Sequence, residues 1–164
     1  MTGMATCVGD LANDLAQAVR EVGNELATSD DAATFRLMVE GPSRDLHPII
    51  RDEIYRIARE ALRNAFGHAQ AHHIEAELIY ADRQFQLRIR DDGKGIAPEF
   101  LEEGRPGHYG LPGMRERAKQ IGATLTIWSG GGSGTEIELS IEASIAYLTP
   151  PGQSRLRLFR KKAG

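Results

Sequence analysis

Two adjacent aspartates and two glycines stand in the segment Asp91-Asp92-Gly93-Lys94-Gly95, a composition that suits ligand binding. Two more glycine-rich segments follow at 107–113 and 130–134, and eleven of the 18 glycines fall between Gly93 and Gly134. Glycine lets the backbone adopt positive φ angles and approach a ligand closely. Successive free N–H groups in such loops bind anionic oxygens. The pattern indicates a nucleotide pocket, although each segment taken singly is as typical of a hairpin turn.

The familiar phosphate-binding motifs are absent from this sequence. There is no G-x-x-x-x-G-K-[ST] segment, which excludes a P-loop site. No G-x-G-x-x-G opens a helix after the first predicted strand, so a dinucleotide-binding fold is unsupported. An H-R-D catalytic loop of the protein-kinase type is also missing. A nucleotide site in this chain must therefore use another architecture.

Hydrophobic periodicity predicts the elements that would position these loops. Apolar residues at helical spacing predict amphipathic helices over 8–27 and from Pro48 to Gly67. A short helix is predicted from Met114 to Ile121, where Gly122 ends it, after an irregular segment at 91–113. Alternating apolar residues predict strands at 35–40, 74–80, 85–90, 125–128 and 136–141. We expect the second and third strands to form an antiparallel hairpin with one face on a core.

The second predicted helix carries two polar residues at a spacing that matters. Glu60 and Asn64 are one helical turn apart and lie on one line beside the apolar stripe. They therefore sit at the edge of the buried face rather than opposite it. An asparagine there needs a partner to offset its desolvation.

Four segments in this order resemble the N, G1, G2 and G3 boxes of the ATP-binding domain of sensor histidine kinases. They are Glu60–Ala69, Asp91–Ile96, Gly107–Ala118 and Gly132–Thr135. This family shares the Bergerat fold with gyrase, the ninety-kilodalton heat-shock chaperone and mismatch-repair ATPases. The E-A-L-x-N-A-x-x-H-A and G-L-x-G-M-R-E-R-A forms resemble the nitrate- and desaturase-sensor subfamily. The resemblance covers residues 8–142.

The resemblance implies a fold and a division of the chain. The expected fold is a two-layer α/β sandwich, with a mixed, largely antiparallel sheet, helices on one face and a glycine-rich ATP lid. The lid would run from about Pro98 to Gly113. We expect an N-terminal extension at 1–7, an ATP-binding catalytic domain at 8–142, and a loosely ordered basic C-terminal tail at 143–164.

On the adenine side, the resemblance implies that Asp91 accepts a hydrogen bond from the amino group of the base. Gly93, Gly95 and Ile96 would shape the loop that holds this carboxylate, and Thr135 would support it directly or through water. A charge-assisted hydrogen bond of this sort contributes roughly 1.5–3 kcal/mol. The alternative interpretations are a plain turn at the aspartate and an ordinary threonine at a strand start.

On the phosphate side, the resemblance implies that Asn64 is a ligand of Mg²⁺, which prefers oxygen donors and keeps several waters. Glu60 would orient water, metal or the attacking group, and His68, another turn along, would approach the phosphates. The alternatives are a structural amide, a helix carboxylate paired with a neighbour, and a histidine at a helix end.

The lid residues implied by the resemblance contribute backbone N–H groups near a helix N-terminus, where anions are favoured. They are Gly107, Gly110, Leu111, Gly113, Met114 and Arg115. One departure stands out: relatives usually have lysine or arginine where this chain has Gly67. Either Arg63, His68 or Arg115 compensates for the missing cation, or triphosphate binding is weakened.

Composition limits the setting. The 164 residues carry a net charge of −3, and the five basic side chains of 143–164 leave −8 on the rest, which excludes a uniformly basic nucleic-acid-binding domain. One cysteine, Cys7, excludes an intramolecular disulfide framework. We expect His72 and His73 to be solvated loop residues rather than a metal pair, and the tail to be a solubilising segment.

We therefore expect the catalytic domain of a two-component sensor histidine kinase, binding ATP with Mg²⁺ and donating the γ-phosphate to a histidine elsewhere. No histidine of this sequence is followed by an acidic residue, as the phosphoacceptor motif requires. Expected partners are the phosphoacceptor and dimerisation helices of the same kinase and a response regulator, but no nucleic acid. The full-length protein would be a homodimer, cytoplasmic or anchored in a membrane. The alternatives are a degenerate nucleotide- or partner-binding module and another Bergerat-fold ATPase.

Overall fold

The computed structural model describes residues 14–28, 33–103 and 110–148. Its strands form one sheet in the order β1-β2-β3-β5-β4, with β1 and β2 parallel and each other neighbouring pair antiparallel. The expected mixed, largely antiparallel sheet is therefore confirmed. In chain order the elements are α2 (Asp14–Leu26), β1 (Thr34–Glu40), α3 (Pro48–Gly67), β2 (His73–Tyr80), β3 (Gln84–Asp91), α4 (Pro98–Glu103), α5 (Leu111–Gln120), β4 (Thr124–Gly130), β5 (Gly134–Glu142) and α6 (Ala143–Ala146).

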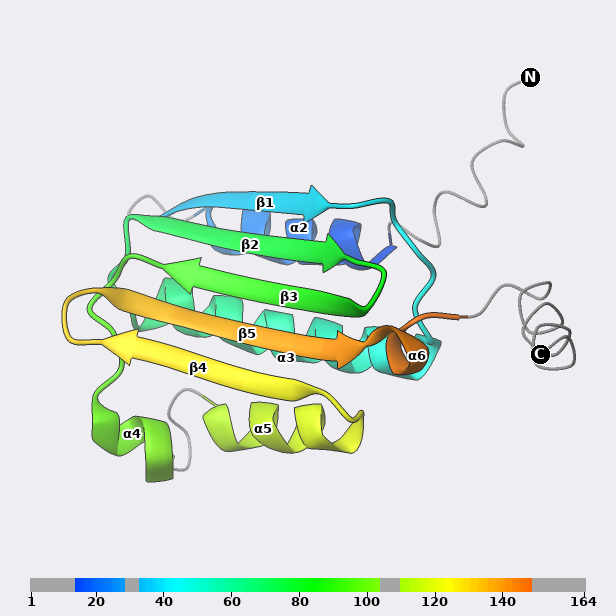
Figure 1. The fold of residues 1–164 in the computed structure, drawn as a ribbon. Helices are drawn as coiled ribbons and strands as arrows, with labels where there is room; N and C mark the ends of the chain where they lie inside the picture. The colour runs from blue at the N-terminus through cyan, green and yellow to red at the C-terminus, as the bar shows by residue number, and fades with distance from the viewer. Residues whose placement is uncertain (1–13, 29–32, 104–109, 149–164) are drawn as a thin grey trace, which may run out of the picture.

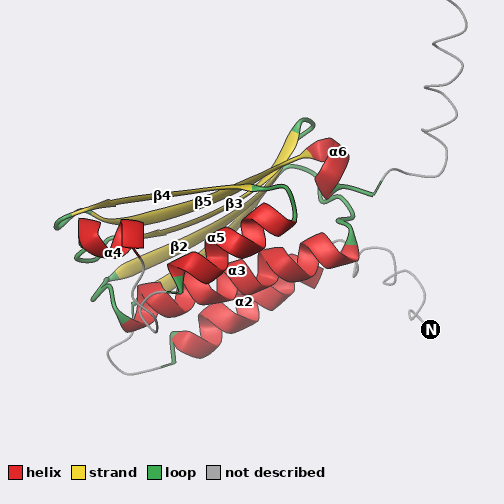
Figure 2. Ribbon diagram, turned by 90° about the horizontal axis from the view of Figure 1, so that it is seen from below, coloured by secondary structure: helices red, strands yellow, loops and turns green. Residues whose placement is uncertain are grey.

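The molecule has two layers (Figures 1 and 2). Helices α2, α3 and α5 lie side by side against one face of the sheet, and no helix of the described residues covers the other face. The strands meet the helices through alternate side chains, as a sheet with one buried face requires. Ile74, Ala76 and Leu78 of β2 and Leu87 and Ile89 of β3 are buried there. This confirms the expected two-layer α/β sandwich.

Helix α3 runs beneath the centre of the sheet and begins and ends where the periodicity predicts. Pro48 occupies the first turn, where its missing N–H costs no helical hydrogen bond. The buried side of the helix includes Ile54, Ile57 and Leu62, each fully inaccessible to solvent. One polar residue, Asn64, shares this buried side among the described residues of the helix. The helix therefore carries an amide into the interface between the layers.

The face of the sheet without helices is polar and held by ion pairs. The guanidinium of Arg88 on β3 lies 3.0 Å from a carboxylate oxygen of Glu77 and 3.1 Å from one of Glu138. Arg90 pairs with Glu136 at 2.7 Å. These cross-strand pairs connect β2, β3 and β5, so the open face contributes to strand registration rather than to the core.

The structure differs from the sequence prediction between residues 98 and 121. Residues Pro98–Glu103 form α4 where an irregular segment was expected, and α5 begins at Leu111 rather than at Met114. Leu111 is fully buried against the core and anchors the first turn, and the proline after it is tolerated there. Gly110 immediately before the helix has a left-handed φ of +58°. The predicted start of this helix was therefore three residues too late.

The C-terminal boundary also differs from the prediction. Residues Ala143–Ala146 form α6, and the buried Tyr147 donates its hydroxyl to the carbonyl oxygen of Ala81 at 3.0 Å. The guanidinium of Arg44 lies 3.9 Å from the centre of the Tyr147 ring. These contacts place 143–148 in the folded body, so the predicted boundary at 142 falls too early. The predicted extension at 1–7, Gly107 and the basic cluster of the tail lie outside the described residues.

Candidate nucleotide site

Apart from the tyrosines, three polar side chains are buried among the described residues, and all three were candidates from the sequence. Asn64 and Asp91 are 8% exposed and Thr135 is 7% exposed. They come from α3, from the end of β3 and from the start of β5, and they line one pocket between the helix layer and the sheet. His68, Gly95 and Ile96 line the same pocket. Ligand pockets are lined mainly by apolar side chains with a few converging polar groups, so the convergence of these three polar side chains on one cavity indicates a site for a polar ligand.

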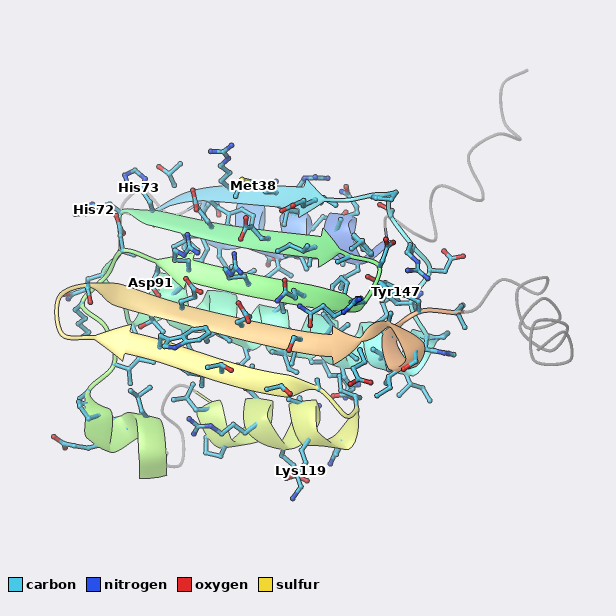
Figure 3. All side chains as sticks on the ribbon, viewed as in Figure 1. Met38, His72, His73, Asp91, Lys119 and Tyr147 are labelled. Atoms are coloured by element: carbon cyan, nitrogen blue, oxygen red, sulfur yellow. The ribbon has the colours of Figure 1, made fainter. Side chains whose placement is uncertain are left out.

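Asp91 is fixed at the edge of the sheet by its neighbours. It pairs in register with Thr135 of β5, and its Oδ1 accepts a hydrogen bond of 2.9 Å from the N–H of Gly93. Burial raises the pKa of the Asp91 carboxyl, while the N–H groups of Gly93 and Thr135 act in the opposite direction. Figure 3 shows Asp91 at the end of β3, far along the sheet from Tyr147. The carboxyl group is thus held in place as an acceptor at the wall of the pocket.

The loop after β3 is held to the fold by main-chain hydrogen bonds on both sides. The N–H of Lys94 donates to the carbonyl of Ala69 just after α3, at 2.8 Å. Its carbonyl accepts from the N–H of Gly132 in the turn between β4 and β5, at 3.1 Å. A Cβ on Gly95, whose φ is +79°, would collide with the carbonyl oxygen of Gly130. Close backbone packing therefore requires glycine at this position of the loop.

Asp92, which the sequence interpretation left without a role, holds the other side of the loop. Its Oδ1 accepts the main-chain N–H groups of His72 and His73, at 2.8 and 2.9 Å. These two bonds keep the pKa of the Asp92 carboxyl below its ordinary value, the bond from His73 contributing more. The imidazoles of both histidines are exposed at the start of β2 (Figure 3). In the described part of the chain, no group of three or more potential His, Cys, Asp or Glu ligands surrounds them.

On the helical side, the candidates separate into two groups. Asn64 lines the pocket beside the small Ala61 and Ala65, and its main-chain carbonyl accepts the N–H of His68 at 2.9 Å. Glu60 is half-buried one turn earlier and lies against Gly110 at the start of α5. Amide and carboxylate oxygens on one helix side are donors that Mg²⁺ accepts, so this chemistry fits a magnesium–phosphate group.

The remaining candidates take different places. Leu111 and Met114 pack into the hydrophobic core, while Gly113 and Arg115 face solvent on α5. Gly93 is buried behind the loop, against the carbonyl of Ala69. Two of the lid candidates thus anchor α5 in the core.

Gly67 is the last residue of α3, and the space beside it is open. A Cβ added there would meet no atom within 4 Å. The nearby Arg63 and His68 are exposed at the same end of the helix. Nothing in the described residues prevents a longer side chain at this position.

Ser129 was also missed by the sequence interpretation. Its Oγ accepts the N–H of Ile96 at 2.6 Å and lies 2.9 Å from Oγ1 of Thr135. The sequence contains a signal for this residue. Every second side chain of β4, at Leu125, Ile127 and Ser129, lies on the buried side, and the serine ends this otherwise apolar series.

Comparison with known proteins agrees with this geometry. Residues 49–145 match the family described as histidine kinase-, DNA gyrase B- and HSP90-like ATPases. The chain belongs to this family. The matched range contains α3, the loop after β3, α5 and the turn before β5, which are the elements that build the pocket.

Within the family, the similarity is to sensor histidine kinases. The chain is 44% identical over 91 residues to the sensor protein VraS of Staphylococcus aureus (strain COL), which is 55% of this chain and 25% of VraS. It is 36% identical over 132 residues to the nitrate/nitrite sensor protein NarQ of Escherichia coli (strain K12), which is 80% of this chain and 23% of NarQ. The chain thus spans about a quarter of these relatives, and its matched part is an ATP-binding catalytic domain of the sensor-kinase type.

A solved structure shows the same fold. The histidine kinase domain of the blue-light activated histidine kinase from Erythrobacter litoralis EL346 superposes with a TM-score of 0.63 at 22% identity. The match covers 82% of this chain and 61% of that one. The helix layer and mixed sheet seen here are therefore those of a histidine kinase ATPase domain.

Proposed function

We propose that this domain binds ATP together with Mg²⁺ and donates the γ-phosphate to a histidine on dimerisation helices of the same kinase. The observation that supports it best is the burial of Asn64, Asp91 and Thr135 around one pocket. Acceptor groups on the sheet side of this pocket and an amide on its helix side are a chemistry that suits a nucleotide with a metal ion.

In this proposal Asp91 accepts a hydrogen bond from the amino group of adenine, with Thr135 beside it. Gly95 and Ile96 form the wall of the base pocket. Guanine carries an oxygen where adenine carries that amino group, so a fixed carboxylate at this position disfavours guanine. The expected selectivity for adenine therefore rests on a group that burial and two main-chain N–H groups hold in one orientation.

On the phosphate side, Asn64 would supply an oxygen to the metal, and Glu60 would orient the metal, water or the attacking group. His68, Gly110 and Arg115 would face the phosphates. Bound Mg²⁺ would neutralise the charge of the phosphate oxygens. Phosphoryl transfer depends mainly on positioning and charge neutralisation, so these residues need only orient the γ-phosphate toward the incoming imidazole.

The proposed partners are the phosphoacceptor helices, a response regulator and, for the full-length protein, a second copy of the kinase. We propose a cytoplasmic position for this domain. None of the helices in the described ranges is long and apolar enough to cross a bilayer.

Calorimetric titration with ATP, with Mg²⁺ or with a chelator, tests the metal assignment. Mg²⁺ is expected to strengthen binding to the wild type, and Asn64→Ala is expected to remove most of that gain while ATP alone still binds. The same affinity gain from Mg²⁺ in both proteins would contradict the role of Asn64.

Turnover of ATP separates a kinase domain from a hydrolase. The isolated chain is expected to bind ATP and hydrolyse it very slowly, because the attacking group is supplied from outside it. Steady hydrolysis that Glu60→Ala abolishes would instead assign Glu60 as a general base for water and would overturn the kinase proposal.

A further inference from the structure

Ser129 lies in a row of side chains that crosses the edge of the sheet. Its register partner is Thr135, whose other register partner is Asp91, so the three residues are neighbours on β4, β5 and β3. All three belong to the helix-facing side of their strands, where Leu125, Ile127, Ile137 and Ile89 precede or follow them in alternation. One strand, β5, thus lies between Ser129 and the carboxylate of the pocket.

The hydroxyl of Ser129 has three polar neighbours. It accepts the N–H of Ile96 at 2.6 Å, lies 3.2 Å from the carbonyl oxygen of Gly134 and lies 2.9 Å from Oγ1 of Thr135. A serine hydroxyl has one proton to donate and two lone pairs to accept. All three contacts are hydrogen bonds in one arrangement only: Ser129 donates to the carbonyl of Gly134 and accepts from Ile96 and from the hydroxyl of Thr135.

This arrangement fixes the direction of the Thr135 proton. When Thr135 donates to Ser129, its hydroxyl presents only lone pairs to the pocket that it lines with Asp91. The pocket wall then offers acceptors from both residues. The two protons of an amino group at C6 of a purine can meet both acceptors, whereas an oxygen at C6 would face them with lone pairs.

We propose that Ser129 is a positioning residue that makes this wall accepting only, and so sets its preference for a 6-amino purine nucleotide over a 6-oxo purine nucleotide. It acts through Thr135 and through Ile96, whose N–H it holds, and it does not touch the nucleotide. The inference rests on the proposed ATP-binding function. It adds Ser129, and the direction of the Thr135 hydroxyl proton, to the features that determine selectivity for the purine base.

The test compares Ser129→Thr with Ser129→Val. Threonine and valine have nearly the same shape, and both are favoured in strands, so the two variants differ by the hydroxyl alone. ATP and inosine triphosphate, which carries an oxo group in place of the amino group, are titrated calorimetrically into each full chain. Thermal unfolding of each variant reports the fold separately.

Wild type and Ser129→Thr are expected to share the same ATP affinity and the same preference for ATP over inosine triphosphate. Ser129→Val is expected to bind ATP about tenfold more weakly, as the loss of one hydrogen bond from the amino group to the Thr135 hydroxyl implies. Its affinity for inosine triphosphate should be unchanged or higher, because the freed proton of Thr135 can donate to the oxo group. A loss of packing alone would weaken both nucleotides together.

Three results would overturn the inference. Ser129→Val could keep the wild-type preference, the threonine and valine variants could lose it equally, or both nucleotides could weaken in parallel. If Ser129→Val does not fold, Ser129→Ala removes the same hydroxyl with less crowding and must show the same loss of preference. A wild type that binds neither nucleotide refutes the proposed function itself, whereas a selective wild type with a selective valine variant refutes only the role of Ser129.

Discussion

Asp91 and Asp92 are adjacent carboxylates in opposite electrostatic environments. Asp91 is buried and its pKa is raised by desolvation, whereas Asp92 is exposed and its pKa is lowered by two main-chain N–H groups. A motif comparison predicts the first residue, because its type and spacing carry the resemblance. The motif comparison does not predict the role of the second residue, because its partners are main-chain N–H groups about twenty residues earlier. No rule of residue spacing connects an aspartate with such groups.

The two carboxylates should affect stability with opposite pH dependence. Above the ordinary pKa of 3.8, the folded state holds the Asp91 proton more tightly than the unfolded state, so stability falls as pH rises through the raised pKa. Asp91→Asn should therefore be more stable than wild type at pH 7, and the difference should shrink as pH falls through the raised pKa and vanish below pH 3.8. Urea denaturation at several pH values measures this.

Asp92→Asn is the matched control. In the wild type, the lowered pKa of the Asp92 carboxyl contributes stability that is present above pH 3.8. This stability is lost as pH falls through the pKa that the carboxyl has in the folded state. Asp92→Asn should be less stable than wild type at pH 7 and similar to it in strong acid. The same sign of change for both variants would contradict the environments described here.

Gly67 offers a test of the missing cation. Gly67→Lys should strengthen ATP binding about two- to fivefold over Gly67→Ala, the gain typical of an exposed ion pair. Both variants improve helix propensity, so comparison with alanine isolates the charge. Calorimetric titration at low and high salt measures the ATP affinity of both variants. Equal affinity of the two variants at low salt would show that the phosphates lie out of reach of the lysine.

At the scale of elements, periodicity predicted most of the fold. The hairpin of β2 and β3 and the whole of α3 followed from apolar spacing, because each buries one regular face. Helix α4 has six residues, too few to show a period. The start of α5 was missed because Gly110-Leu111-Pro112-Gly113 reads as a loop, and only the burial of Leu111 makes it a helix.

The junction of the lid and α5 predicts contrasting effects for two glycines. Gly110→Ala should destabilise the domain by about 1–2 kcal/mol for its left-handed φ, and more because a Cβ would press on the Glu60 carboxylate. Gly113 lies in α5, and a Cβ added there would meet no atom within 4 Å. Gly113→Ala should therefore stabilise the domain by up to about 1 kcal/mol. Thermal unfolding of both variants checks the difference, and equal shifts would contradict the geometry of this junction.

Two tyrosines at the far end of the sheet make another pair. Among the described residues the buried Tyr80 hydroxyl finds no hydrogen-bond partner, and burial raises its pKa to about 12. Tyr80→Phe should therefore leave stability unchanged or increase it. Tyr147→Phe, which loses the hydrogen bond that the single hydroxyl proton shares between the carbonyls of Ala81 and Gln84, should cost about 0.5–1.5 kcal/mol. Denaturant midpoints of both variants measure the difference, and a larger loss of stability for Tyr80→Phe would contradict these hydrogen-bond assignments.

At the scale of the molecule, the fold separates two tasks. One end of the sheet gathers the pocket, the glycine loops and the turn before β5, while the other end is closed by α6 and Tyr147 (Figure 3). The pocket is built from α3, β3 and β5, elements that are far apart in sequence, so its burial pattern could not be predicted from spacing. The sequence resemblance named the residues, and only the folded chain shows three of them buried together.

The measurement that tests the central proposal most directly is calorimetric titration of the wild-type chain with ATP and with GTP in the presence of Mg²⁺. The arrangement of Asp91, Thr135 and Asn64 predicts that ATP binds and that GTP binds at least about tenfold more weakly, the discrimination expected from one charge-assisted hydrogen bond. Equal affinity for the two nucleotides, or no binding of ATP at millimolar concentration, would contradict it.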